Sequence, residues 1–242
     1  MKRPAGFVEI RQGTDTCWLR EDGLSTLSGS VFEPSFWQSR QAVTGTATGR
    51  GTTWFVRDGE RHLVLRHYRR GGLFGRLVKD LYAGIRPAHS RAMRELSLLE
   101  AMYRDGLPVP KPMAARMSRR GPLYRADLLI ARIADASDLL AVLQRAPLSG
   151  NQWQQIGAMI RRFHLAGIDH TDLNIHNILL DQSGTSWLID FDKCSKRAPG
   201  DWQQANLARL LRSLNKEKGL HPTLHWNQQD WPALLNGYHS QS

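Results

Sequence analysis

Cysteine and long apolar runs are scarce in this chain of 242 residues. The two cysteines, Cys17 and Cys194, lie far apart and match no metal-binding or redox spacing, so we expect no disulfide scaffold and a reducing compartment. No segment approaches the roughly 20 apolar residues of a membrane-spanning helix, so any membrane association is expected to be peripheral. Lys2 and Arg3 are followed by no apolar stretch, and we expect no secretory signal peptide.

Acidic residues are also in short supply, and the shortage is local. The chain has 33 Lys and Arg against 22 Asp and Glu, a net charge of +11. Residues 61–120 contain fourteen basic and four acidic side chains, whereas the rest of the chain is nearly balanced. A local positive block favours a negatively charged partner: a nucleic acid, an anionic membrane or a phosphorylated substrate. A solvated basic surface without a partner is the alternative.

The remaining composition is that of a globular protein, with 41% apolar residues and eight Trp. Residues 1–40 show little periodicity and receive no assignment. After them the pattern predicts strands at 52–56 and 62–66, joined by a turn at Asp58-Gly59, and a third strand at 128–133. It also predicts helices at 90–104, 152–165 and 203–214, and a hairpin from the runs 178–180 and 187–189. The apolar residues expected to be buried are Trp153, Ile156, Gly157, Ile160 and Phe163 in the second helix and Leu207, Leu210, Leu211 and Leu214 in the third. This order predicts an α+β fold with a β-rich N-terminal lobe (1–133) and a helical C-terminal lobe (134–242).

The first predicted helix carries an acidic residue on its apolar side. Ser90 is expected to cap the helix, and Ala92, Leu96, Leu99 and Tyr103 form its apolar stripe. Glu95 falls within the same arc, where it either extends to the surface along the helix or meets a buried partner.

The densest polar cluster is His170-Thr-Asp-Leu-Asn-Ile-His-Asn177, and Asp190-Phe-Asp192 follows it after a short hairpin. This pattern resembles the protein-kinase catalytic loop H-R-D-L-x-x-x-N with the later D-F-G. The resemblance makes Asp172 the catalytic aspartate and makes Asn177 and Asp190 the Mg²⁺ ligands. Phosphoryl transfer needs a carboxylate for the attacking hydroxyl and oxygen ligands for the metal, and these residue types supply both.

Each of these residues also has a simpler interpretation. Asp172 could be a helix cap or a turn residue. His170 and His176 could bind Zn²⁺ with Asp172, although no third His or Cys stands at ligand spacing. His170 is better interpreted as a structural residue that braces the loop than as a catalyst.

The N-terminal half contains further kinase-like features, with departures from the pattern. Gly49 and Gly51 lie in a Gly-rich turn, Arg66 stands where kinases carry the strand Lys, and Glu95 is expected to pair with it. The guanidinium group of an arginine can form two hydrogen bonds to phosphate oxygens, so Arg66 remains a candidate phosphate-binding residue. Asp192 replaces the Gly of D-F-G, no A-P-E motif is present, and only about 50 residues follow. A small-molecule or glycolipid kinase is therefore favoured over a protein kinase.

These motifs together resemble the 3-deoxy-D-manno-octulosonic acid (Kdo) kinase family of lipopolysaccharide core kinases, over about residues 45–215. The residues that carry the resemblance are Gly49-Arg-Gly-Thr-Thr-Trp54, Leu65-Arg-His-Tyr-Arg-Arg-Gly-Gly72, Gly106-Leu-Pro-Val-Pro110, Tyr124-Arg-Ala-Asp-Leu-Leu129, Asp169 to Leu180 and Trp187 to Asp192. The family implies a protein-kinase-like two-lobe fold with a reduced C-terminal lobe. It also implies ATP- and Mg²⁺-dependent phosphorylation of the 4-hydroxyl of Kdo on a lipid A precursor.

The resemblance also gives the positive block a partner. Its basic residues between Arg61 and Arg86 alternate with apolar ones, which suits a surface that docks on anionic headgroups at the cytoplasmic face of a Gram-negative inner membrane. Nucleic-acid binding has no supporting motif and is not expected. A heptose kinase of the same pathway and a non-catalytic, membrane-associated kinase-like module are the alternatives. Nothing in the motifs bears on oligomeric state.

Overall fold

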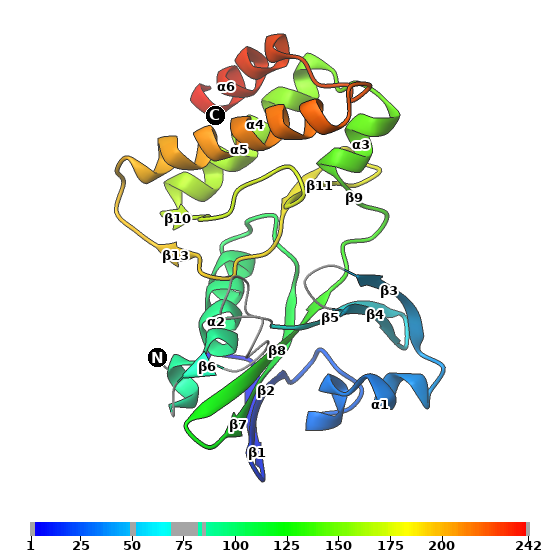
Figure 1. Ribbon diagram of the computed structural model, residues 1–242. Helices are drawn as coiled ribbons and strands as arrows, with labels where there is room; N and C mark the ends of the chain where they lie inside the picture. Colours follow the sequence, from blue (N-terminus) through cyan, green and yellow to red (C-terminus); the bar gives the residue numbers. More distant parts are fainter. Residues whose placement is uncertain (1–2, 49–51, 69–81, 84–85, 241–242) are drawn as a thin grey trace. The chain divides into compact units, whose positions relative to one another are not determined.

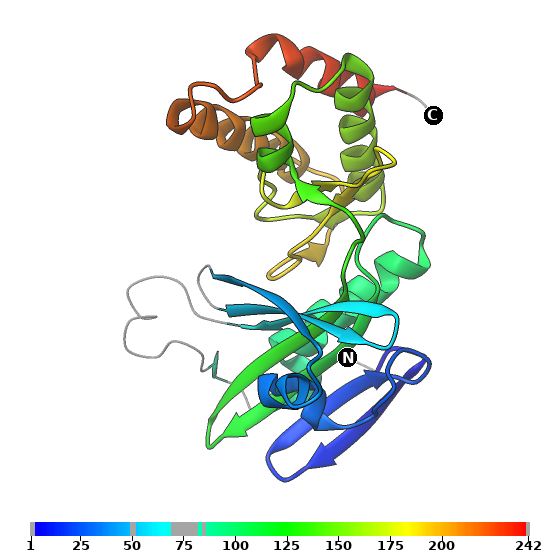
Figure 2. The ribbon, with the colours of Figure 1, turned by 90° about the vertical axis from the view of Figure 1, so that its right-hand side faces the viewer.

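The computed structural model describes residues 3–48, 52–68, 82–83 and 86–240 (Figures 1 and 2). The chain divides into two compact units. The N-terminal unit comprises Met1–Tyr103 and Pro110–Arg132, and the C-terminal unit comprises Arg104–Val109 and Ile133–Ser242. A large antiparallel sheet dominates the first and helices dominate the second, which confirms the predicted α+β fold class.

Eight antiparallel strands make up most of the N-terminal unit. Seven of them follow the order β1-β2-β7-β8-β5-β4-β3, and the short β6 pairs with β8. Their bounds are β1 (Phe7–Gln12), β2 (Asp15–Arg20), β3 (Val43–Thr48), β4 (Thr52–Asp58), β5 (Arg61–His67), β6 (Tyr82–Ala83), β7 (Pro112–Arg120) and β8 (Leu123–Ala131). The strand predicted at 128–133 is thus the second half of a longer strand that ends at Ala131.

The hairpin of β4 and β5 determines where Arg66 points. It turns at Gly59, whose φ of +60° lies in the left-handed region that favours glycine, as the Asp58-Gly59 pair predicted. Leu63 and Leu65 are fully buried on one face of the sheet. Because strand side chains alternate between faces, Arg66 lies on the opposite face.

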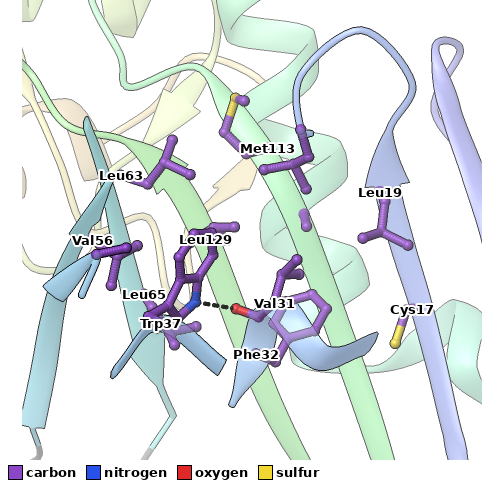
Figure 3. Packing of buried hydrophobic residues seen from close by; sticks show 13 residues of the cluster. Cys17, Leu19, Val31, Phe32, Trp37, Val56, Leu63, Leu65, Met113 and Leu129 are labelled. Carbon is purple, nitrogen blue, oxygen red and sulfur yellow. Dashed lines mark hydrogen bonds between the residues drawn. The ribbon is translucent and has the colours of Figure 1, made fainter. Parts of the chain in front are cut away.

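The main core of this unit lies on the Leu65 face (Figure 3). There the strand residues meet a 3₁₀ turn, Gly29–Phe32, and the short helix α1 (Pro34–Gln38). Trp37 is fully buried, and its Nε1 donates a hydrogen bond to the Val31 carbonyl at 2.8 Å. These elements fall in the stretch of residues 1–40 for which the sequence predicted no structure.

Helix α2 (Arg91–Arg104) lies on the Arg66 side of the sheet. Ser90 caps it as predicted, because its Oγ accepts a hydrogen bond from the Met93 amide at 3.2 Å. Leu96 and Leu99 of the predicted stripe are buried, but Tyr103 is 40% exposed, so the apolar side ends one turn early.

The C-terminal unit consists mainly of four helices, with short strands that fix the loops between them. The helices are α3 (Leu139–Arg145), α4 (Gly150–Leu165), α5 (Trp202–Leu220) and α6 (Trp231–His239). The strands are β9 (Ser137–Asp138), β10 (Ile168–Asp169), β11 (Ile178–Leu180), β12 (Ser186–Leu188) and β13 (Ser195–Lys196). The predicted hairpin is that of β11 and β12, and the last predicted helix is longer than expected at both ends.

Helices α4 and α6 touch through two glycines. A Cβ atom added at Gly157 would lie 1.9 Å from the Leu234 carbonyl oxygen, and one added at Gly237 would lie 1.9 Å from that of Gln154. The absence of both side chains therefore allows backbone contact between the helices. Nearer the end of α4 that leads to β10 and the polar cluster, His164 Nδ1 and the Tyr238 hydroxyl of α6 form a hydrogen bond at 2.9 Å.

Candidate active site

The polar cluster forms a loop that begins directly after β10 and ends at β11. Two backbone turns fold it: the Leu173 amide donates to the His170 carbonyl at 3.1 Å, and the Asn177 amide donates to the Asn174 carbonyl at 3.1 Å. The adjoining strands hold only its two ends, so the remaining backbone groups of the loop need side chains or solvent as hydrogen-bond partners.

Asn177 is tied to the backbone of Asp172. Its Nδ2 donates to the Asp172 carbonyl at 3.0 Å, and Asn174 Nδ2 donates to the same oxygen at 2.9 Å. Asn177 is only 8% exposed, so this hydrogen bond fixes its amide group. The orientation leaves the amide oxygen Oδ1, a suitable ligand for Mg²⁺, outside the bond to the loop.

His170 links the loop to the Asp190 segment. Its ring is 1% exposed, its Nε2 donates to the Ile189 carbonyl at 3.0 Å, and the Ile189 amide donates to the Asn177 carbonyl at 3.0 Å. Burial lowers the pKa of His170, although that hydrogen bond and the charges of Asp190 and Asp172 act in the opposite direction. A neutral, buried imidazole bonded to backbone is the brace that the sequence predicted.

Asp190 occupies a strained turn immediately after this brace. Its φ of +65° lies in the left-handed region, which is unusual for a residue other than glycine. The next residue, Phe191, is buried against His170 and Phe163, with ring centroids 5.0 and 5.9 Å apart. The packed phenyl ring and the His170 contact therefore hold the backbone that carries Asp190.

Asp172 differs from His170 and Asn177 because its side chain is half exposed. Its Oδ1 accepts a hydrogen bond at 3.1 Å from Arg209 of α5, and the two side chains are 50% and 48% exposed. Asp172 caps no helix, since the loop after it contains only turns. An exposed carboxylate on a loop fixed by buried residues is well placed to meet a substrate hydroxyl.

The two histidines that a zinc site would use lie in different settings. His170 Nε2 is bonded to a carbonyl, whereas His176 is half exposed, with its ring nitrogens 3.8 Å from Asp138 and 3.7 Å from Glu217. Within the described ranges, no three His, Cys, Asp or Glu side chains gather into a metal-binding group. An Mg²⁺ site of the predicted kind needs only two protein ligands, Asn177 and Asp190, with phosphate and water oxygens as the rest.

In the N-terminal unit, Arg66 and Glu95 form the predicted pair. Arg66 Nη1 lies 3.7 Å from Glu95 Oε1, and the Tyr68 hydroxyl donates to Glu95 Oε2. The Glu95 side chain is 3% exposed, so the interpretation in which it reaches the surface is wrong. Arg66 is 26% exposed, so the pair is partly accessible through its arginine. Gly49 and Gly51 lie outside the described residues.

Two of the segments that carry the family resemblance, residues 65–72 and 124–129, also contribute to a network of charged side chains. Asp127 of β8 accepts from Arg116 Nε at 2.6 Å and also contacts His67 Nδ1. Arg116 in turn pairs with Glu33, which joins the sheet to the start of α1. The motifs around His67 and Asp127 therefore include residues that hold the N-terminal unit together.

Sequence reasoning missed the polar side of α5. Asn206, Arg209 and Ser213 each hydrogen-bond to the loop, with Asn206 Oδ1 accepting from the His170 amide at 3.0 Å and Ser213 Oγ from the Ile175 amide at 3.3 Å. Their spacing of three and four residues was a usable signal, but only the leucines of that helix were considered.

The N-terminal unit also contains a cavity of about 380 Å³ near the β4–β5 turn. Arg40, Arg57, Asp58 and Glu60 are among the residues that line it, so its charges balance. None of the predicted site residues lines this cavity.

Known proteins match the chain over nearly its whole length. The sequence profile of the lipopolysaccharide kinase (Kdo/WaaP) family matches residues 34–238. A 3-deoxy-D-manno-octulosonic acid kinase of Vibrio vulnificus (strain CMCP6) is 50% identical over 235 residues, which cover 97% of each chain. Its counterpart in Haemophilus influenzae (strain 86-028NP) is 45% identical over 216 residues, 86% of this chain and 89% of its own. The chain therefore belongs to the lipopolysaccharide kinase (Kdo/WaaP) family.

Proposed function

We propose that this protein is a Kdo kinase that transfers the γ-phosphoryl group of ATP to the 4-hydroxyl of Kdo on a lipid A precursor. The family and its relatives make it a phosphotransferase that acts on a hydroxyl group. The observation that carries the assignment is the loop in which Asn177 is hydrogen-bonded to Asp172 at 3.0 Å and joined through Ile189 to Asp190. The names of the relatives support Kdo as the acceptor sugar.

We propose that Asp172 receives the acceptor hydroxyl. The acceptor oxygen forms a bond to the γ-phosphorus while the bond from that phosphorus to the β–γ bridging oxygen breaks, and ADP leaves with the electron pair. The hydroxyl proton passes to the Asp172 carboxylate. Because this carboxylate is half exposed on a braced loop, it is available to a substrate without a rearrangement of the core.

Asn177 and Asp190 would hold Mg²⁺. The amide oxygen of one and the carboxylate of the other are hard oxygen ligands, which fit this ion better than a softer metal. When bound, Mg²⁺ neutralises charge on the β- and γ-phosphates. Arg66, oriented by buried Glu95, contributes a permanent positive charge to the ATP phosphates, and Gly49 and Gly51 belong to the same proposal.

Mass spectrometry of a Kdo–lipid A precursor incubated with the protein, ATP and Mg²⁺ tests the function. We expect a mass increase of one phosphate, and location of that phosphate on the Kdo 4-hydroxyl by fragmentation or NMR. A heptose-containing acceptor assayed in parallel should not react. Phosphorylation of the heptose acceptor alone would make the protein a heptose kinase, and no transfer to either would leave a non-catalytic module.

We also propose that the protein acts as a peripheral protein at the cytoplasmic face of the inner membrane. Within the part of the chain that the structure describes, no helix has the length and apolarity needed to cross a bilayer. Most basic residues of the stretch 61–86, including Arg69, Arg70, Arg76 and Lys79, lie outside the described residues. Changing these four to Glu should weaken binding to vesicles that contain anionic lipid, and unchanged binding would place the membrane contact elsewhere.

A further inference from the structure

Helix α5 runs beside the candidate catalytic loop (Figure 1). It carries a polar stripe whose side chains bond to that loop. Its members are Asn206, Arg209, Ser213 and Glu217, at intervals of three, four and four residues. Residues at these intervals share one side of a helix. Leu207, Leu210 and Leu214 are buried in the core of the C-terminal unit, which fixes the rotation of the helix and therefore the direction of the stripe.

The stripe meets the loop in matching order. Asn206 accepts from the His170 amide at 3.0 Å, Arg209 donates to Asp172 Oδ1 at 3.1 Å, and Ser213 accepts from the Ile175 amide at 3.3 Å. Asn206 and Ser213 bind backbone groups on either side of Asp172. Arg209 is the member of the stripe that contacts the side chain of Asp172.

The Arg209 contact does little for folding. Both side chains are about half exposed, and ion pairs of this kind contribute little to stability because solvent screens them. The contact does constrain the carboxylate, because a guanidinium hydrogen bond to one oxygen restricts rotation of the group. Among the residues that the structure describes, no hydrogen bond to Asp172 Oδ2 is found, so the second oxygen remains available to a substrate.

We infer that Arg209 is a positioning residue for the phosphoryl transfer. It holds Asp172 by Oδ1 and so presents Oδ2 to the acceptor hydroxyl. Asn206 and Ser213 hold the loop backbone in the register that this contact needs. The inference rests on the role proposed above for Asp172.

The test compares Arg209→Gln with Arg209→Lys and with Arg212→Gln. Arg212 is also exposed and lies three residues further along α5, so its variant removes the same charge from the same helix. We expect Arg209→Gln to lower kcat about 10- to 100-fold, because a misplaced catalytic group loses orientation, while the KM values for ATP and acceptor change less than about 2-fold. Arg209→Lys should recover part of kcat, and Arg212→Gln should match the wild type. All variants should melt at the wild-type temperature.

Two further results separate this inference from the proposed function. In an Asp172→Asn background, Arg209→Gln should cause no additional loss, since a residue that acts through Asp172 has nothing left to position. Wild-type kcat in Arg209→Gln, or a raised acceptor KM at unchanged kcat, overturns the inference; the second result would make Arg209 a substrate-binding residue. If Asp172→Asn itself retains turnover, the role proposed for Asp172 fails instead.

Discussion

Two arginine–carboxylate pairs that involve predicted site residues are arranged in opposite ways. Glu95, in the N-terminal unit, is 3% exposed beneath Arg66, whereas Asp172, in the C-terminal unit, is 50% exposed beside Arg209. In the first pair the core fixes the carboxylate and the arginine remains partly accessible. In the second pair the carboxylate is accessible and the arginine restrains it. The accessible member of each pair is the one proposed to meet a ligand.

The difference predicts how each pair responds to mutation. Removal of a buried, hydrogen-bonded carboxylate leaves groups unsatisfied in the core and affects folding. Removal of an exposed carboxylate has little effect on folding, so a loss of activity there reports chemistry. The following four predictions examine this contrast, in order of decreasing effect on the measured property.

Asp172→Ala should give the largest effect. We expect a loss of at least about 10³-fold in kcat, because both the orientation of the hydroxyl and the acceptor for its proton are removed. ATP affinity, measured by equilibrium binding, should be unchanged, and the free energy of unfolding should shift by less than about 0.5 kcal/mol. Turnover close to that of the wild type would show that Asp172 has no catalytic role. It would also contradict the proposal that the accessible member of each pair meets a ligand.

Asn177→Ala should lower activity about 100-fold and raise the Mg²⁺ concentration needed for half-maximal rate, since a metal ligand is lost. Asn174→Ala is a closely matched control. Its side chain donates to the same Asp172 carbonyl, at 2.9 Å against 3.0 Å, but Asn174 is not a predicted metal ligand. A titration of rate against Mg²⁺ should therefore shift for Asn177→Ala alone. An equal shift in both variants would mean that Asn177 acts only on the loop.

Glu95→Ala should affect both stability and nucleotide binding. Loss of the buried carboxylate leaves the Tyr68 hydroxyl and Arg66 without this partner, at a cost of about 1–3 kcal/mol in urea unfolding. The KM for ATP should rise about 10-fold because Arg66 loses its orientation. Glu100→Ala is the control: Glu100 is equally buried on α2 but pairs with Arg20, so it should lower stability and leave the ATP KM unchanged.

Buried His164 has the smallest effect near neutral pH, because its influence on stability develops only as the pH falls below 6.5. Burial lowers the pKa of His164 from 6.5 to about 4, with Asn206 and Asp169 acting in the opposite direction. The folded state therefore binds fewer protons than the unfolded state between these values, and stability falls as pH drops from 6.5 towards 4. One such group contributes about 1.4 kcal/mol per pH unit. Urea unfolding of His164→Phe, measured across this pH range, should show a slope smaller by about that amount.

Much of the fold was predictable where local signals were strong. The Asp58-Gly59 turn, the Ser90 cap and the apolar stripe of α4 identified their elements, because each depends on neighbouring residues. Strands β1, β2 and β7 and helices α3 and α6 were missed, and β3 (Val43–Thr48) lies where the Gly-rich sequence indicated a turn. β7 reads Pro-Met-Ala-Ala-Arg-Met-Ser-Arg-Arg, and its charged Arg116 is buried only because Asp127 and Glu33 neutralise it. The carboxylates that neutralise Arg116 lie far from it in the sequence, so no local pattern could predict its burial.

The candidate site was predictable to a similar extent. The residue types and spacing within 170–192 identified the loop, and the Glu95 position on an apolar arc indicated a buried partner. The contacts of Asn206, Arg209 and Ser213 were not predicted, although the residues recur at helical intervals. Their partners lie more than thirty residues away in the sequence, so the register between helix and loop became visible only with the fold.

Because of this register, the hydrogen bonds between α5 and the loop depend on the rotation of the helix about its axis as well as on its residue types. A residue inserted between Trp202 and Asn206 would turn the rest of the helix by about 100° relative to its start, since an α-helix has 3.6 residues per turn. Asn206, Arg209 and Ser213 would then rotate away together while the leucines rotated out of the core. An insertion after Leu220 would leave all three contacts in place. The contacts with the loop therefore depend on the number of residues between the N-terminal end of α5 and Asn206, and not on the length of the helix beyond Leu220.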